Sequence, residues 1–78
     1  MNDSKIKQDE IRIGQNIRKI RLERKIGQTE LVMRLQLKGI DMTRESLVKI
    51  ERGIQHIYAT QLKAIKEELD TTYDELMK

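Results

Sequence analysis

The sequence predicts an all-α domain of five short helices, and three observations support this fold class. The chain contains no proline, and its four glycines are spaced as helix boundaries would be. Residues that favour helices dominate the composition. No stretch alternates apolar and polar residues for long enough to indicate a strand. We expect helices at about residues 9–24, 28–37, 44–52, 60–69 and 73–77, after a polar N-terminal arm at residues 1–8.

Apolar stripes mark the first two expected helices. Ile13, Ile17 and Ile20 recur at i, i+4 and i+7, which places them on one face of a helix. Leu31 and Leu35 share a face in the same way, and the glycine that follows them can take the left-handed conformation that ends a helix. Both segments therefore present one apolar face to a common core.

Capping residues mark the start of two later helices. Thr43 can cap a helix because its hydroxyl accepts a hydrogen bond from a free backbone N–H group of the next turn. Thr72, with Glu75 three residues later, has the pattern of a capping box. The five helices together predict an aliphatic core of Ile13, Ile17, Ile20, Ile26, Leu31, Leu35, Leu47, Ile50, Leu62, Ile65, Leu69 and Leu76.

Size and composition exclude several classes of protein. A chain of 78 residues forms one domain, and its small core contributes a net stability of about 3–5 kcal/mol. With no cysteine and one histidine, disulfides, thiolate chemistry and zinc-finger sites are excluded, and no metal or other cofactor is expected. The sequence offers no facing pair of carboxylates that would indicate an enzyme, so we expect neither catalysis nor a small-molecule substrate. No segment resembles a membrane span or a signal peptide, so we expect a cytoplasmic protein.

The charge is distributed unevenly along the chain. Residues 1–53 carry 13 lysines and arginines against 8 acidic residues, whereas residues 54–78 carry 3 against 5. The basic part is the candidate surface for a polyanion. The alternative is that these charges only keep helix faces in solution.

Three stretches of the sequence resemble the Cro/repressor-type helix-turn-helix family, also called the XRE family. They are IGQNIRKIRLERKIGQTELVMRL, TRESLVKIERG and LKAIKEELDTTYDEL, in the order of that family, and together they span most of the chain. The resemblance implies a five-helix repressor-like domain in which the helix at residues 44–52 enters the DNA major groove. It also implies a transcriptional regulator, in particular a repressor, that binds double-stranded DNA as a homodimer on a palindromic operator.

The resemblance and the side-chain chemistry assign roles around this recognition helix. Arg44 can hold guanine O6 and N7 together, and Glu45 can accept a hydrogen bond from cytosine N4. Lys49 can reach a guanine or a phosphate, and Val48 can contact a thymine methyl group. The expected base contacts are Arg44, Glu45, Val48 and Lys49, and the expected phosphate contacts are Gln28, Thr43, Ser46, Arg52 and His56.

Several of these residues have alternative roles that do not involve DNA. The helix dipole favours Glu45 in a first turn and Arg52 in a last turn whatever they bind. Gln28 can be a polar first-turn residue, and His56 can be a solvent-exposed bystander. We expect Glu51 to bond within the protein, because a phosphate repels a carboxylate. On the first helix, Arg18, Lys19 and Arg21 are expected to form a solvated face that attracts DNA only at long range.

The chain departs from the family between the second and third helices. Seven residues, QLKGIDM, separate Leu35 from Thr43, where the family turn has about two. The placement of the two helices relative to each other is therefore left open. Leu37, Ile40 and Met42 within this insertion are apolar, so we expect them to fold onto the core.

The dimer contact is expected in the C-terminal part of the chain. The last helix is so short that its own chain can leave Tyr73, Leu76 and Met77 uncovered, and a partner subunit would exclude water from them. The rival to a DNA-binding function is a helical protein-interaction module, such as an antitoxin or a repressor partner.

Overall fold

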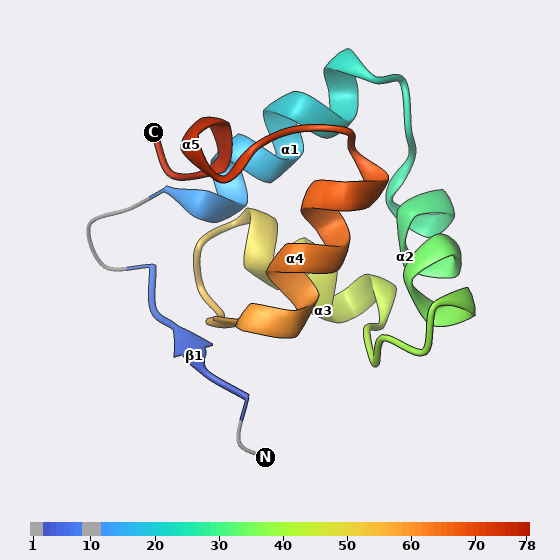
Figure 1. Cartoon of the computed structure of the whole chain (residues 1–78), viewed down its shortest axis with the longest axis horizontal. Helices are drawn as coiled ribbons and strands as arrows, with labels where there is room; N and C mark the ends of the chain where they lie inside the picture. Colours follow the sequence, from blue (N-terminus) through green and yellow to red (C-terminus); the bar gives the residue numbers. More distant parts are fainter. Residues whose placement is uncertain (1–2, 9–11) are drawn as a thin grey trace.

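The computed structural model describes residues 3–8 and 12–78, which form five helices and one small sheet (Figure 1). The mostly helical class is confirmed, whereas the sheet was not predicted because strands of two residues leave no alternating pattern. The elements are β1 (Lys5–Ile6), α1 (Ile13–Glu23), α2 (Gln28–Leu37), α3 (Arg44–Glu51), β2 (Ile57–Tyr58), α4 (Ala59–Glu68) and α5 (Tyr73–Leu76).

The helix boundaries agree closely with the expected ones except at the start of α1. Arg12 is the N-cap of α1, with φ −91° and ψ 56°, so α1 begins at Ile13. Residues 9–11 of the expected helix lie outside the described part of the chain. The bounds of α2 are those predicted from its stripe and its closing glycine.

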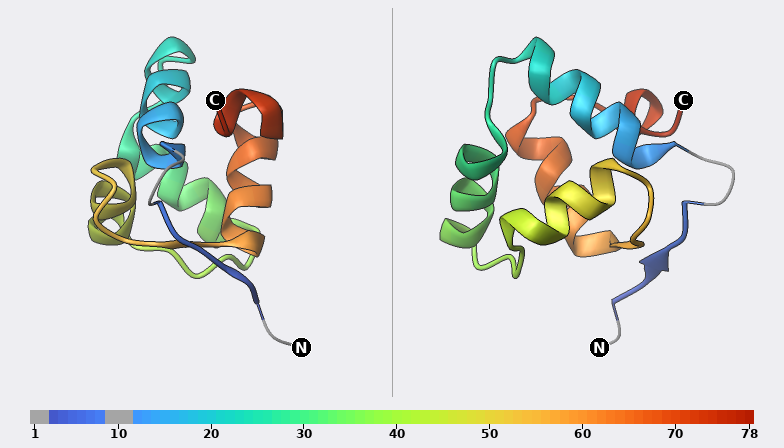
Figure 2. Two further views of the ribbon diagram at one scale, coloured as in Figure 1. Left: turned by 90° about the vertical axis from the view of Figure 1, so that its left-hand side faces the viewer. Right: turned by 180° about the vertical axis from the view of Figure 1, so that it is seen from behind.

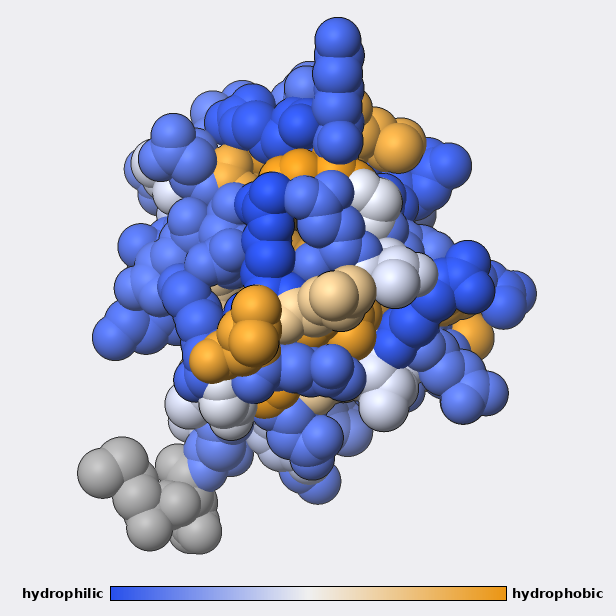
Figure 3. Space-filling model, turned by 90° about the vertical axis from the view of Figure 1, so that its right-hand side faces the viewer, coloured by the Kyte–Doolittle hydropathy of each residue, from blue (hydrophilic) through white to orange (hydrophobic). Residues whose placement is uncertain are grey.

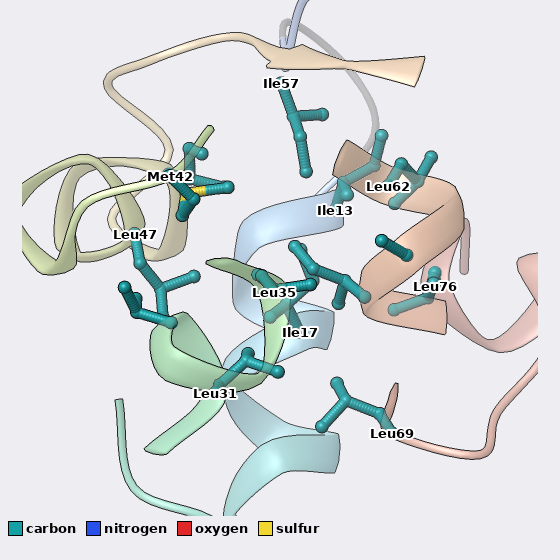
Figure 4. Packing of buried hydrophobic residues seen from close by; sticks show 14 of the residues in the cluster. Ile13, Ile17, Leu31, Leu35, Met42, Leu47, Ile57, Leu62, Leu69 and Leu76 are labelled. Atoms are coloured by element: carbon teal, nitrogen blue, oxygen red, sulfur yellow. The ribbon is translucent and has the colours of Figure 1, made fainter. Parts of the chain in front are cut away.

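The helices enclose one aliphatic core (Figure 4). All twelve residues predicted for the core are buried. Helix α1 packs against α3 and α5, and α2 packs against α3 and α4. The left panel of Figure 2 shows α3 and α4 on opposite sides of the molecule. Four further apolar residues complete the core, namely Val32, Met42, Ile57 and Ala64.

The insertion between α2 and α3 is ordered and folds back on the core. Met42 is 2% exposed and Ile40 packs against the core, as expected, whereas Leu37 is 87% exposed and that expectation is wrong. The Nε2 atom of Gln36 donates to the carbonyl of Met42 at 3.0 Å, and Nε2 of Gln61 donates to a carbonyl of the same segment. The extra residues thus form a short, fixed connection.

An exposed ion-pair cluster ties the end of α2 to α4. Lys38 Nζ lies 2.8 Å from a carboxylate oxygen of Glu68 and 3.4 Å from one of Glu67. The hydrogen bond to Glu68, followed by that to Glu67, raises the pKa of Lys38 above its ordinary value of 10.5, although partial desolvation opposes the shift. Because exposed pairs contribute little to stability, this cluster mainly orients the end of α2.

The N-terminal arm packs onto the helical body (Figure 2). Strand β1 pairs antiparallel with β2, with Ile6 opposite Ile57. The carbonyl of Ser4 accepts from the backbone N–H of Ala59 at 2.8 Å, and a carboxylate oxygen of Asp3 accepts from the N–H of Thr60 at 3.2 Å. The arm therefore satisfies N–H groups that the first turn of α4 leaves without helical partners.

Four helices end with the same backbone motif. The residue after each C-cap has a positive φ, and its N–H and that of the next residue bond back to carbonyls of the last turn. These residues are Lys25 (φ 58°), Gly39 (φ 81°), Gly53 (φ 78°) and Asp70 (φ 52°). Two of the four positions therefore carry side chains in a conformation that suits glycine.

Lys25→Gly is expected to raise the free energy of unfolding by about 1 kcal/mol, because it removes the Cβ clash of the left-handed conformation. Asp70→Gly should stabilise less, since aspartate tolerates this conformation better than lysine. Thermal unfolding followed by circular dichroism would show a rise of about 4–8 °C for Lys25→Gly. The control, Lys19→Gly within α1, should destabilise by about 1 kcal/mol. A lower unfolding temperature for Lys25→Gly would contradict the prediction.

Candidate nucleic-acid interface

The start of α3 is fixed by its own cap. Thr43 has φ −107° and ψ 161°, and its hydroxyl oxygen accepts from the backbone N–H of Ser46 at 3.0 Å. The Thr43 hydroxyl also donates to the Ser46 side chain at 3.1 Å. The predicted cap is confirmed, and it explains why the helix begins at Arg44.

Helix α3 has one buried and one exposed face. Leu47, Ile50 and Glu51 are buried against the rest of the domain. The right panel of Figure 2 shows α3 at the front of the molecule when it is seen from behind. The predicted contact residues lie on the outer face: Arg44, Glu45, Lys49 and Arg52 are exposed, and Ser46 and Val48 are half-buried.

The outer face of α3 has an excess of positive charge. Positions 44, 48 and 52 follow one another at four-residue spacing, and position 49 lies beside them. Among residues 3–8 and 12–78, no carboxylate lies within salt-bridge distance of Arg44, Lys49 or Arg52. These cations are thus available to an external anion, with Glu45 as the one carboxylate of the face.

A buried ion pair holds the inner face of α3. Arg21 and Glu51 are 5% and 4% exposed, and the guanidinium donates to both carboxylate oxygens, at 2.8 and 2.9 Å. A further guanidinium N–H donates to the carbonyl of Ile26 at 2.9 Å. The internal bonding of Glu51 is confirmed, whereas the expected solvated position of Arg21 is wrong.

The burial of Arg21 is indicated by the spacing of apolar residues in the sequence. Arg21 follows Ile13 and Ile17 at the same four-residue spacing and so continues their buried stripe. A charged residue on such a stripe needs a buried partner of opposite charge. The periodicity could have predicted burial of Arg21, but it could not identify Glu51, which is 30 positions away.

The start of α2 joins the same network. Gln28, its first residue, is half-buried, and its Nε2 donates to a Glu51 oxygen at 3.1 Å. The N-cap, Gly27, supplies no side-chain hydrogen bond, so the first turn of α2 keeps backbone N–H groups without a side-chain partner. Such a helix start suits a phosphate oxygen, because the N–H groups and the helix dipole both favour an anion.

The segment after α3 is held by a residue of the N-terminal arm. Gln8 Nε2 donates to the carbonyls of Ile50 and Gln55, both at 2.9 Å, and its Oε1 accepts from the N–H of Gly14 at 2.7 Å. His56 is half-buried, and its ring meets that of Tyr58 edge to face at 5.1 Å between centroids. Sequence reasoning missed Gln8, since a glutamine in a polar arm carries no pattern that marks it.

The C-terminal helix is covered by its own chain. Leu76 is fully buried, and Asn16 of α1 donates to its carbonyl at 2.8 Å. The expectation that Leu76 needs a partner subunit to exclude water is therefore wrong. Met77 is half-buried against the core, and Tyr73 is 43% exposed, with Lys66 Nζ 4.9 Å from its ring centroid.

Exposed apolar side chains lie instead on other parts of the surface. Met33 and Leu37, one turn apart on α2, are 58% and 87% exposed. Figure 3, which views the molecule from the α2 side, shows hydrophobic residues gathered among hydrophilic ones. Leu22 of α1, Ile54 after α3 and Tyr73 of α5 are exposed as well, so the exposed apolar surface is spread over several elements.

No helix within the described residues has the length and apolar character needed to cross a membrane. Residues 3–8 and 12–78 hold no group of three or more metal-ligating side chains. Scans of protein-family models, curated proteins and solved structures found nothing that matches this chain.

Proposed function

We propose that this chain binds double-stranded DNA in a sequence-specific manner, as a transcriptional regulator of the repressor type. The observation that carries the proposal is α3, a capped helix with one face buried and three cations on the other. A helix of this kind fits the major groove, where arginine and lysine can bind guanine and phosphates.

In the proposed helix-turn-helix, α2 and α3 act as one unit. The ion pair between Arg21 and Glu51, together with Gln28, fixes the start of α2 relative to the end of α3. Gln28 and the uncapped N–H groups beside it then bind a backbone phosphate while α3 lies in the groove. Thr43, Ser46, Arg52 and His56 are the further phosphate contacts of this proposal.

We further propose that two copies bind a palindromic operator. A twofold dimer would place its recognition helices about 34 Å apart, which is one turn of DNA. Tyr73 and Met77 remain candidates for the contact because they are not fully buried. Leu76 is not a candidate.

The proposed function is tested by selecting duplexes from a random DNA library at moderate salt. We expect one enriched sequence, and Arg44→Ala and Lys49→Ala should each lose about 1–3 kcal/mol of discrimination at one base position. Gln28→Ala should weaken binding to all duplexes alike. Fluorescence anisotropy with the selected and a scrambled duplex measures both effects.

The matched control is Lys63→Ala, which removes an exposed charge from α4, a helix on the opposite side of the molecule from α3 in the left panel of Figure 2. Its affinity should equal that of the wild type. An unenriched library, or an Arg44→Ala/Lys49→Ala variant with wild-type discrimination, would overturn the proposal. The exposed Met33 and Leu37 favour the second candidate, a protein-interaction module, which an unenriched library would support.

A further inference from the structure

The N-terminal arm and the segment after α3 enclose a shallow depression on the surface. Its volume is about 210 Å³, and its lining consists of Lys7, Gln8, Gly53, Ile54, Gln55 and His56. Two of these residues can carry positive charge, and no carboxylate is part of the lining that the structure describes. The depression lies directly beyond the C-terminal end of the proposed recognition helix.

The backbone around Lys7 is held from both sides. The preceding residue, Ile6, pairs with Ile57 in the sheet. The following residue, Gln8, donates to the carbonyls of Ile50 and Gln55. Lys7 therefore has a fixed position relative to α3, although it is remote from α3 in the sequence.

The end of a helix normally repels an anion, because its last carbonyls point outward. Here those carbonyls are occupied by donors. The carbonyl of Ile50 accepts from both Gln8 and the N–H of Gly53, and the carbonyl of Lys49 accepts from the N–H of Ile54. The negative end of α3 is thus partly neutralised where it meets the depression.

We propose that the N-terminal arm belongs to the DNA interface, and that Lys7 binds a phosphodiester of the DNA backbone next to His56. The inference rests on the proposed function and extends it, because it adds a second segment of the chain to the interface. A phosphate contact positions the protein without reading sequence. Lys7 should therefore strengthen binding to every duplex equally.

The test compares Lys7→Ala, Lys7→Arg and the control Lys63→Ala with the wild type. Fluorescence anisotropy gives the affinity of each for the selected and the scrambled duplex between about 50 and about 300 mM salt. For Lys7→Ala, we expect both affinities to fall by the same factor and the slope of log affinity against log salt to shrink by about 1. Lys7→Arg should keep the wild-type slope because it keeps the positive charge. Lys63→Ala should also keep the wild-type slope, because the charge that it removes lies away from the proposed interface.

Two outcomes would overturn the inference, and they are distinguishable. If the wild type binds DNA and Lys7→Ala keeps its slope, the arm does not contact phosphate, while the proposed function stands. If the wild type binds neither duplex, the proposed function and the inference both fail. Because the Lys7 side chain is exposed, thermal unfolding of Lys7→Ala should match the wild type, so that a changed slope reports on binding and not on folding.

Discussion

Gly14→Ala is expected to leave the domain largely unfolded at 25 °C. A Cβ atom at this position would lie 1.7 Å from the carbonyl oxygen of Ile50 and 2.9 Å from the side chain of Gln8. The first neighbour is backbone of α3, so α1 and α3 would have to separate, and both are rich in core residues. We expect a loss of about 3 kcal/mol or more, which approaches the whole net stability of a domain this small.

The matched control for Gly14→Ala is Gly27→Ala. Nothing lies within 4 Å of a Cβ at Gly27, and its φ of −77° suits any residue. Gly27→Ala should therefore cost at most about 1 kcal/mol, the difference between glycine and alanine at an N-cap. Circular dichroism at 25 °C shows whether Gly14→Ala is unfolded, and urea unfolding gives the small loss expected for Gly27→Ala. Equal stability of the two variants would show that α1 and α3 do not approach as closely as this structure describes.

Glu51→Ala is expected to cost about 3–5 kcal/mol, because it leaves the guanidinium of Arg21 buried without its carboxylate. Arg21→Met should cost a similar amount for the converse reason. In the double variant, where neither charge remains, the loss should be smaller than the sum of the two single losses. Because each single loss approaches the whole net stability, the double-mutant cycle is measured by urea unfolding in the presence of the stabilising osmolyte TMAO, and additive losses would contradict the coupling.

An exposed pair provides the control for this cycle. Arg34 and Glu30 form an ion pair one turn apart on α2, with side chains that are 40% and 50% exposed. Glu30→Ala should change the free energy of unfolding by about 0.5 kcal/mol or less, because solvent screens the pair. The contrast isolates the effect of burial from that of charge alone.

Loss of the buried ion pair should also weaken DNA binding at the proposed interface. Gln28 donates to Glu51, so Glu51→Ala removes the partner that orients its amide. We therefore expect any Glu51 variant that still folds to bind DNA more weakly, although the carboxylate itself does not face the groove.

Local sequence patterns were enough to predict most of the helical framework. Apolar spacing identified the buried faces of the helices, and Thr43 and Gly53 marked the two ends of α3 within a residue. These features depend on neighbours within one helical turn, so they can be recognised in a single segment. The exposure of Lys49 follows from the same spacing, since it places this residue opposite the face that carries Leu47 and Ile50.

By itself, the sequence determined the helices, the aliphatic core and the outward face of α3. Only the tertiary structure decided which polar groups meet. Arg21 pairs with a residue 30 positions away, and Gln8 bonds to a carbonyl 42 positions away. Such contacts depend on how separate helices pack, and no local periodicity encodes them. For the same reason, only the fold showed that α1 covers Leu76 and that the N-terminal arm lies beside the end of α3.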